Sequence, residues 1–101
     1  MAMASVKIRS EREVPNGWLF EAESVVDSSS ERHRHELQLS WADYNHWSVD
    51  GADPPQRVAE AVIRFLLLRL DPDVLPKRFD AATARRRFSD ADQEIPKLIR
   101  R

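Results

Sequence analysis

The stretch that decides the fold is PPQRVAEAVIRFLLLRL, residues 54–70. Its apolar side chains recur at helical spacing, at Val58, Ala61, Val62, Phe65 and Leu66. This spacing predicts one long helix over 54–70 whose apolar stripe faces a core. Asp53 before Pro54 is typical of a helix start, because an aspartate can cap the first turn and proline suits its first position.

The same helix carries a second apolar stripe beside the first, formed by Ile63, Leu67 and Leu70. One sheet face does not need so wide an apolar surface, so this stripe is a candidate interaction surface. The stripe could be buried by the chain's own C-terminal helices, or by a second copy of the chain in a homodimer with the isologous contact common in oligomers. A chain of 101 residues has few other ways to bury two stripes, which favours the C-terminal helices.

The residues before this helix predict three strands of an antiparallel meander, over 5–14, 18–26 and 32–39. Residues 6–9 alternate apolar and polar side chains, as in a half-buried strand. Pro15, Asn16 and Gly17 then supply the turn chemistry of a hairpin, because proline fixes φ and Asn-Gly tolerates positive φ. The alternation predicts a sheet with one buried face.

Short helices complete the predicted fold, over 41–47, 81–88 and 90–100. Ser40 is a predicted N-cap for the first of them, with its hydroxyl accepting from the Asp43 backbone N–H. Residues beyond 70 give no strand signal. The sequence therefore predicts a single α+β domain over 1–101, with a three-stranded antiparallel meander packed on one main helix and followed by short C-terminal helices.

Composition narrows the class of protein. Hydrophobic residues make up 42% of the 101 residues, which suffices for one modest core. The chain has no cysteine, which excludes disulfides and thiolate chemistry. Its longest apolar run is far shorter than the roughly 20 residues that span a bilayer. The first ten residues lack the apolar stretch of a signal peptide. We therefore expect a cytoplasmic protein that does not enter a membrane.

Charge is unevenly distributed along the chain, although the net charge is only −1. Residues 1–53 hold five Lys/Arg and ten Asp/Glu, whereas residues 76–101 hold eight and four. The candidate basic patch is Arg85, Arg86 and Arg87. Such a run is usually a solvated helix face, and it can also contact phosphates. The balanced total charge disfavours nucleic acid as the partner.

The three histidines are His33, His35 and His46. His33 and His35 alternate on one predicted strand, so both side chains point the same way and resemble a zinc-ligand pair. The chain offers no cysteine and no second spaced ligand pair, which favours a half-exposed strand end over a metal site. We therefore predict no metal and no cofactor.

Aromatic residues gather in the first half of the chain, at Trp18, Phe20, Trp41, Tyr44 and Trp47. Aromatic side chains on a sheet can stack nucleic-acid bases, as in RNA-binding sheets. Those sheets carry basic residues among the aromatics, whereas the strands of this chain are expected to be acidic. Aromatic residues also dominate small cores, so packing under the helix is the favoured interpretation.

Catalytic motifs are missing from the sequence. Two glycines are too few for a phosphate-binding loop or a dinucleotide fingerprint, and no serine or threonine stands in a nucleophile-elbow context. The sequence favours a non-enzymatic binding or regulatory module that acts through protein–protein contacts. The alternative is a nucleic-acid-binding protein that uses Arg85–Arg87. An enzyme would need a pocket that places a histidine beside carboxylates.

The order of motifs resembles that of a group of small uncharacterised bacterial proteins over residues 33–96. The segments that carry the resemblance are residues 35–44, 55–69 with Phe65-Leu66-Leu67, 75–80, and 86–88 with Arg86-Arg87-Phe88. The resemblance implies three strands, a core helix and a short helical tail, in a bacterial cytosolic protein. It implies no activity.

Overall fold

The computed structural model describes residues 4–26, 31–71 and 73–99, and the predicted end of the last helix at residue 100 lies outside them. Within these ranges the chain is a mixed α+β fold. Its elements are β1 (Ala4–Val14), β2 (Gly17–Val26), β3 (Arg32–Ser40), α1 (Trp41–Trp47), α2 (Pro55–Leu67), β4 (Arg78–Asp80), α3 (Ala82–Arg87) and α4 (Ala91–Ile99). The α+β class predicted from the sequence is confirmed, with one strand more than expected.

The first three strands form the predicted antiparallel meander in the order β1-β2-β3. The hairpin between β1 and β2 turns at Pro15 and Asn16, and Gly17 opens β2. A Cβ atom on Gly17 would clash with the Leu39 backbone carbonyl on the neighbouring strand. Only glycine therefore lets β2 and β3 approach so closely at the end of the hairpin.

A fourth strand corrects the prediction that no strand follows residue 70. β4 pairs with β3 in parallel, and Phe79 stands opposite Leu37. Backbone hydrogen bonds extend the pairing beyond both ends of β4, from the Glu36 N–H to the Lys77 carbonyl (2.7 Å) and from the Ala81 N–H to the Gln38 carbonyl (2.8 Å). Three residues are too short to display alternation, so the strand exists because the edge of β3 offers it a partner.

The main helix is shorter than predicted, because α2 runs over Pro55–Leu67 and not over 54–70. The chain leaves the helix in turns, with the Leu70 N–H still donating to the Leu66 carbonyl at 2.8 Å. The expected cap by Asp53 is wrong, since Pro54 occupies the N-cap position. The Asp53 carboxylate instead accepts a hydrogen bond from the Ser48 hydroxyl at 2.8 Å.

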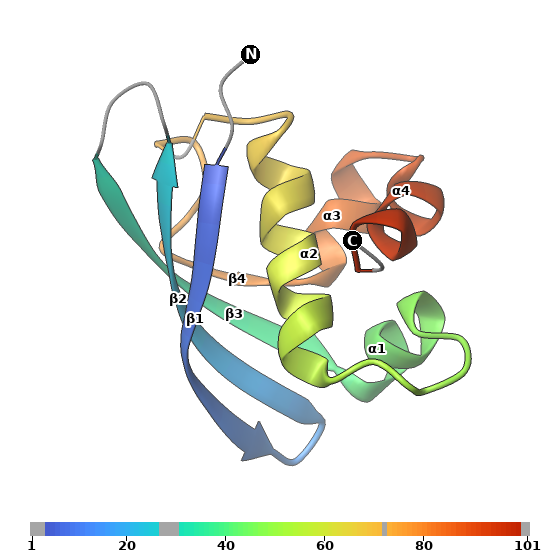
Figure 1. Cartoon of the computed structure of the whole chain (residues 1–101). Coiled ribbons are helices and arrows are strands. Elements are labelled where there is room, and N and C mark those ends of the chain that lie inside the picture. Colours follow the sequence, from blue (N-terminus) through green and yellow to red (C-terminus); the bar gives the residue numbers. More distant parts are fainter. Residues whose placement is uncertain (1–3, 27–30, 72, 100–101) are drawn as a thin grey trace.

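The core lies on both sides of α2, which is placed between the sheet and α4 (Figure 1). All five residues of the first apolar stripe are buried. In the second stripe Ile63 is fully buried, whereas Leu67 and Leu70 are half-buried and pack against the core. Ile63 therefore has no surface to offer a partner. In the described part of the chain, no helix is long and apolar enough to cross a membrane.

Candidate functional site

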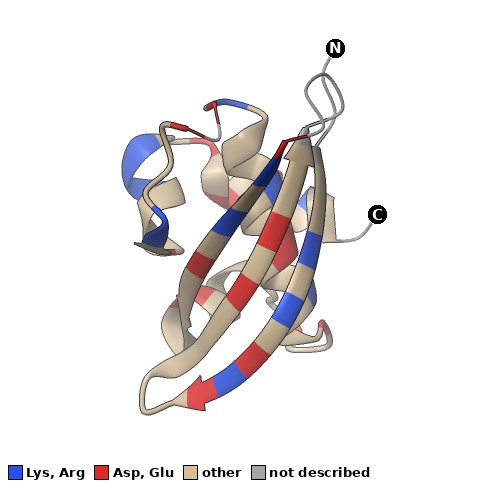
Figure 2. Cartoon of the chain, turned by 90° about the vertical axis from the view of Figure 1, so that its left-hand side faces the viewer, with Lys and Arg blue, Asp and Glu red and all other residues tan. Residues whose placement is uncertain are grey.

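One face of the sheet carries the helices, and the opposite face is uncovered (Figure 2). Strand alternation sends every second side chain to this uncovered side, which we call the outer face. Its described residues are Ser5, Lys7, Arg9, Ser10 and Arg12 from β1, Leu19, Glu21, Glu23 and Val25 from β2, and Arg32, Arg34, Glu36 and Gln38 from β3. Charged residues therefore dominate the outer face.

This composition corrects the expectation that the strands are acidic. Residues 4–14, 17–26 and 32–40 hold five Lys/Arg and five Asp/Glu, because the other five acidic residues of the N-terminal half lie outside the strands. Two of the acidic strand residues, Glu11 and Glu13, stand opposite the inward-facing Phe20 and Trp18. The outer face consequently holds more basic than acidic side chains.

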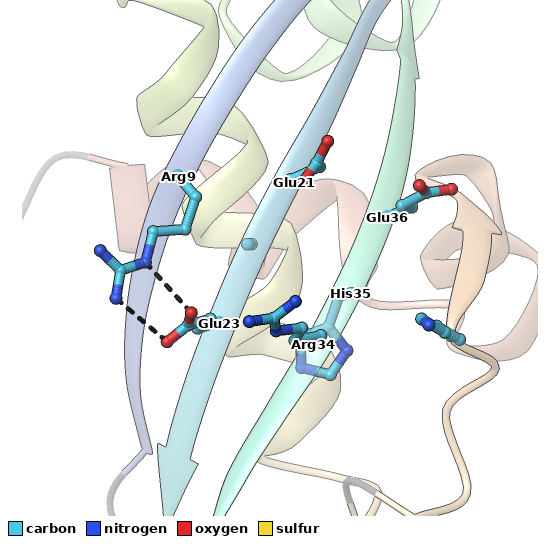
Figure 3. Close-up of a pocket in the computed structure, with 8 residues that line it drawn as sticks. Arg9, Glu21, Glu23, Arg34, His35 and Glu36 are labelled. Carbon is cyan, nitrogen blue, oxygen red and sulfur yellow. Dashed lines mark hydrogen bonds and ion pairs between the residues drawn. The ribbon is translucent and has the colours of Figure 1, made fainter.

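A β-bulge in β1 positions the first ion pair of the outer face. The pairing register with β2 shifts between Ile8 and Ser10, so that Arg9 is the extra residue and its side chain is redirected. Both guanidinium contacts of Arg9 with the Glu23 carboxylate measure 3.2 Å (Figure 3). The hydrogen bond from Arg9 lowers the pKa of Glu23 and outweighs the opposing effect of partial burial.

A second ion pair crosses from β3 to β4. The Arg78 Nε atom lies 2.5 Å from the Glu36 Oε2 atom, and this hydrogen bond lowers the pKa of Glu36 and raises the pKa of Arg78. Glu21 faces Glu36 across the β2–β3 ladder and makes no ion pair with any described residue. Two carboxylates facing one another destabilise a sheet, and Arg78 relieves this repulsion on one side only.

Two adjoining depressions cross the outer face and share Glu21 and Glu36. The larger has a volume of about 560 Å³ and is lined by Arg9, Glu21, Glu23, Arg34, His35, Glu36 and Lys77, together with Ala22 (Figure 3). The smaller has a volume of about 520 Å³ and extends toward Arg12 and Arg78. Their lining is charged, unlike the apolar pockets that take small molecules, and it suits a polar, extended ligand.

The ion pairs neutralise some charged side chains of the outer face and leave others without a counter-charge. Glu23 is engaged by Arg9 and, at 3.8 Å, by Arg32, while Glu36 is engaged by Arg78. Arg12, Arg34 and Lys77 line the depressions and make no ion pair with a described residue, and neither does Lys7 elsewhere on the outer face. Two acidic side chains that line the depressions, Glu21 and Glu11, also make no ion pair with a described residue. The unpaired charge of the outer face is therefore positive.

The histidines lie in three separate environments. His35 is buried, and its Nε2 atom is 2.7 Å from the Ser24 hydroxyl, while its buried Nδ1 atom has no described hydrogen-bond partner. His33 lies beside Glu31 and Asp73, and His46 on α1 lies 3.0 Å from Asp92. His33 and His35 are neighbours on β3, and the described contacts of His46 are with α4. The described residues contain no group of three or more His, Asp or Glu side chains placed to hold a metal ion.

The three arginines of the predicted basic patch do not share one environment. Arg85 donates to Asp43 at 2.8 Å and to Asp92 at 2.9 Å, and its guanidinium lies 5.1 Å from the centre of the Trp47 ring. Partial burial acts to lower the pKa of Arg85, but the hydrogen bonds to the two aspartates outweigh it and raise the pKa. Arg85 therefore joins α1, α3 and α4, and only the other two arginines of the run are exposed.

The aromatic residues divide in the same way. Trp18, Phe20, Tyr44 and Trp47 are buried, in agreement with packing under the helix. Trp41 is the exception, since half of it (50%) is exposed and its ring centre lies 4.3 Å from that of Trp18. Sequence reasoning could not separate Trp41 from the others, because its exposure depends on how α1 meets the end of the hairpin. No aromatic residue lies among the outward-facing described positions of β1–β3.

Fold and outer face together define a small α+β domain with an open, charged sheet. In comparisons with protein-family models, curated proteins and solved structures, no match to the chain was found. The resemblance to small uncharacterised bacterial proteins therefore stays a prediction.

Proposed function

We propose that the protein is a small, non-enzymatic binding module of the bacterial cytoplasm that holds a protein partner on its outer face. The observation that carries this proposal is the set of unpaired cations beside two adjoining depressions on an uncovered sheet. A sheet backed by a packed helix layer holds the backbone of these residues in fixed positions, so that only their side chains have to be ordered when a partner binds. Such preorganisation lowers the entropy cost of binding.

A binding role accounts for the chemistry better than catalysis does. The larger depression does place His35 beside carboxylates, as an enzyme would require, but only 3% of His35 is exposed. Its Nε2 atom is bound to Ser24, which is fully buried. The carboxylates Glu23 and Glu36 are held in ion pairs that lower their pKa values, which suits fixed charges and not general acids near neutral pH.

A protein partner fits better than a nucleic acid bound through Arg85–Arg87. Arg85 is neutralised by Asp43 and Asp92, which leaves two exposed arginines, fewer than the phosphate contacts that nucleic-acid binders usually make. Nucleic-acid bases could also stack on aromatic residues of the sheet, but those aromatic residues face the core.

Site-specific photo-crosslinking in cells of the source organism tests the proposal. A photoreactive amino acid at the exposed outer-face position Gln38 should capture one defined protein, whereas the same group at the exposed position Gln93 on α4 should not. Both positions are solvent-exposed, so the comparison isolates the face of the molecule. Equal adducts from both positions, or none from Gln38, would show that the outer face is not the binding surface.

A further inference from the structure

We infer that the partner segment held on the outer face is an acidic polypeptide whose carboxylates contact Arg34 and Lys77. This inference rests on the proposed function and names the chemistry of the partner. Both cations line the larger depression, and neither makes an ion pair with a described residue. They come from β3 and from the residue before β4, whose carbonyl accepts the Glu36 backbone N–H at 2.7 Å. Both charges thus line one depression, from β3 and from the segment that leads into β4.

Arg34 makes no ion pair, although a carboxylate stands opposite it on the neighbouring strand. Glu23 stands opposite Arg34 in the β2–β3 register, yet both of its carboxylate oxygens are engaged by Arg9 (Figure 3). The bulge thus places two Arg9 contacts on Glu23, while Arg34 acts on Glu23 through its charge alone and makes no ion pair with it. An arginine fork without a partner is matched best by a carboxylate or phosphate, which it contacts through two parallel hydrogen bonds.

The distribution of acidic residues favours a polypeptide over a nucleic acid as the anion. A nucleic acid carries phosphate charge continuously along its length. On the outer face, such a chain would run over Glu21 as well as over the basic residues, and Glu21 has no described counter-charge. A peptide can place glutamate or aspartate beside Arg34 and Lys77, and neutral or basic residues opposite Glu21. Basic and acidic side chains are both present on the outer face, and a peptide with a complementary order of charges can match them.

Fluorescence anisotropy with a short, labelled glutamate-rich peptide tests the inference, with its glutamine analogue and a single-stranded DNA of equal charge as comparison probes. We expect the acidic peptide to bind at low salt, more tightly than either comparison probe. Replacing both cations with Arg34→Glu and Lys77→Glu should weaken binding about tenfold or more, as expected for two lost partly exposed charge pairs. The milder variant Arg34→Gln with Lys77→Gln should also weaken it, and it adds no repulsion that could disturb folding.

The double variant Arg86→Glu with Arg87→Glu is the matched control, because it makes the same change in net charge at two exposed positions of α3. It should leave peptide affinity nearly unchanged. An equal loss in this control would overturn the inference in favour of unspecific attraction. Tighter binding of DNA, lost in the outer-face variants, would assign a nucleic acid instead. Absence of peptide binding at low salt would refute the acidic partner, while a Gln38 crosslink would still support the binding module.

Discussion

Replacing Arg85 by methionine should destabilise the fold strongly, although the sequence presents this residue as one of three equivalent arginines. Methionine keeps most of the apolar stem and removes the guanidinium that holds Asp43 and Asp92. The Asp43 side chain is only 8% exposed, so its carboxylate would be left nearly buried without a cation. Trp47 would remain as a donor to Asp92, at 2.9 Å, but no described donor replaces Arg85 at Asp43.

The size of the effect follows from the exposure of each pair. Breaking a buried ion pair costs about 3–5 kcal/mol, whereas exposed pairs contribute at most about 1 kcal/mol. Arg85 and Asp92 are 35% and 37% exposed, so solvent screens their pair, and the Asp43 pair lies between the two limits. We expect a loss of about 2–3 kcal/mol in the free energy of unfolding. For a domain of this size, that loss lowers the melting temperature by about 8–20 °C.

Urea unfolding monitored by tryptophan fluorescence measures this loss, because Trp47 lies within the cluster. The control is Arg86→Met, one residue along the same helix and exposed, which should change stability by less than about 0.5 kcal/mol. A double-mutant cycle with Asp43→Asn should give a coupling energy of about 1–2 kcal/mol. Equal effects of the two methionine variants would refute the assignment of Arg85 to the structural network.

Three further predictions concern the core, the hairpin and the second stripe. Burial, with a smaller effect of the neighbouring histidine, lowers the pKa of His35 in the folded protein. The unfolded chain therefore binds a proton more readily, and the melting temperature of the wild type should fall as the pH drops below about 6.5. The melting temperature of a His35→Phe variant should fall less over the same range. Gly17→Ala should lower the free energy of unfolding in urea by about 2–4 kcal/mol, because its Cβ would meet backbone atoms. Gly51→Ala has open space around it but a φ of +65°, and it should lower the free energy of unfolding by about 1–2 kcal/mol. Equal losses would contradict the steric reasoning. Leu67→Glu should lower stability by about 1–3 kcal/mol without changing solution mass, whereas Leu68→Glu, at a position 58% exposed, should be nearly neutral; a changed mass for Leu67→Glu would indicate a dimer contact.

The parts of the fold that depend on neighbours in sequence could be predicted. The hairpin follows from the turn chemistry of residues 15–17, and the cap of α1 from the Ser40 hydroxyl, which accepts from the Asp43 N–H at 3.1 Å as expected. The spacing of apolar residues predicts helix α2 correctly, but it extends the helix to residue 70 instead of Leu67. The reason is that two of the next three residues, Leu68 and Leu70, continue the apolar pattern. Local signals were sufficient wherever one element forms by itself.

The parts that depend on distant partners could not be predicted. Strand β4 needs the edge of β3, and its Arg78 meets Glu36 across 42 residues of sequence. The role of Arg85 depends equally on an aspartate 42 residues away. On the outer face, alternation indicates which side chains point outward, but the pairing of Arg9 with Glu23 depends on a bulge that no local motif marks. Which cations remain unpaired therefore emerges only from the assembled sheet.

The bulge at Arg9 has a further consequence, for the solubility of the protein. β1 is an edge strand of eleven residues, and beyond it no described strand continues the sheet. A long, regular edge strand is a template on which other chains can add strands and aggregate. The extra residue interrupts the regular row of backbone donors and acceptors and increases the local twist, while Lys7 and Arg9 place charge beside the interruption. The same backbone irregularity that positions Arg9 against Glu23 is therefore expected to make the edge of β1 a poorer template for added strands.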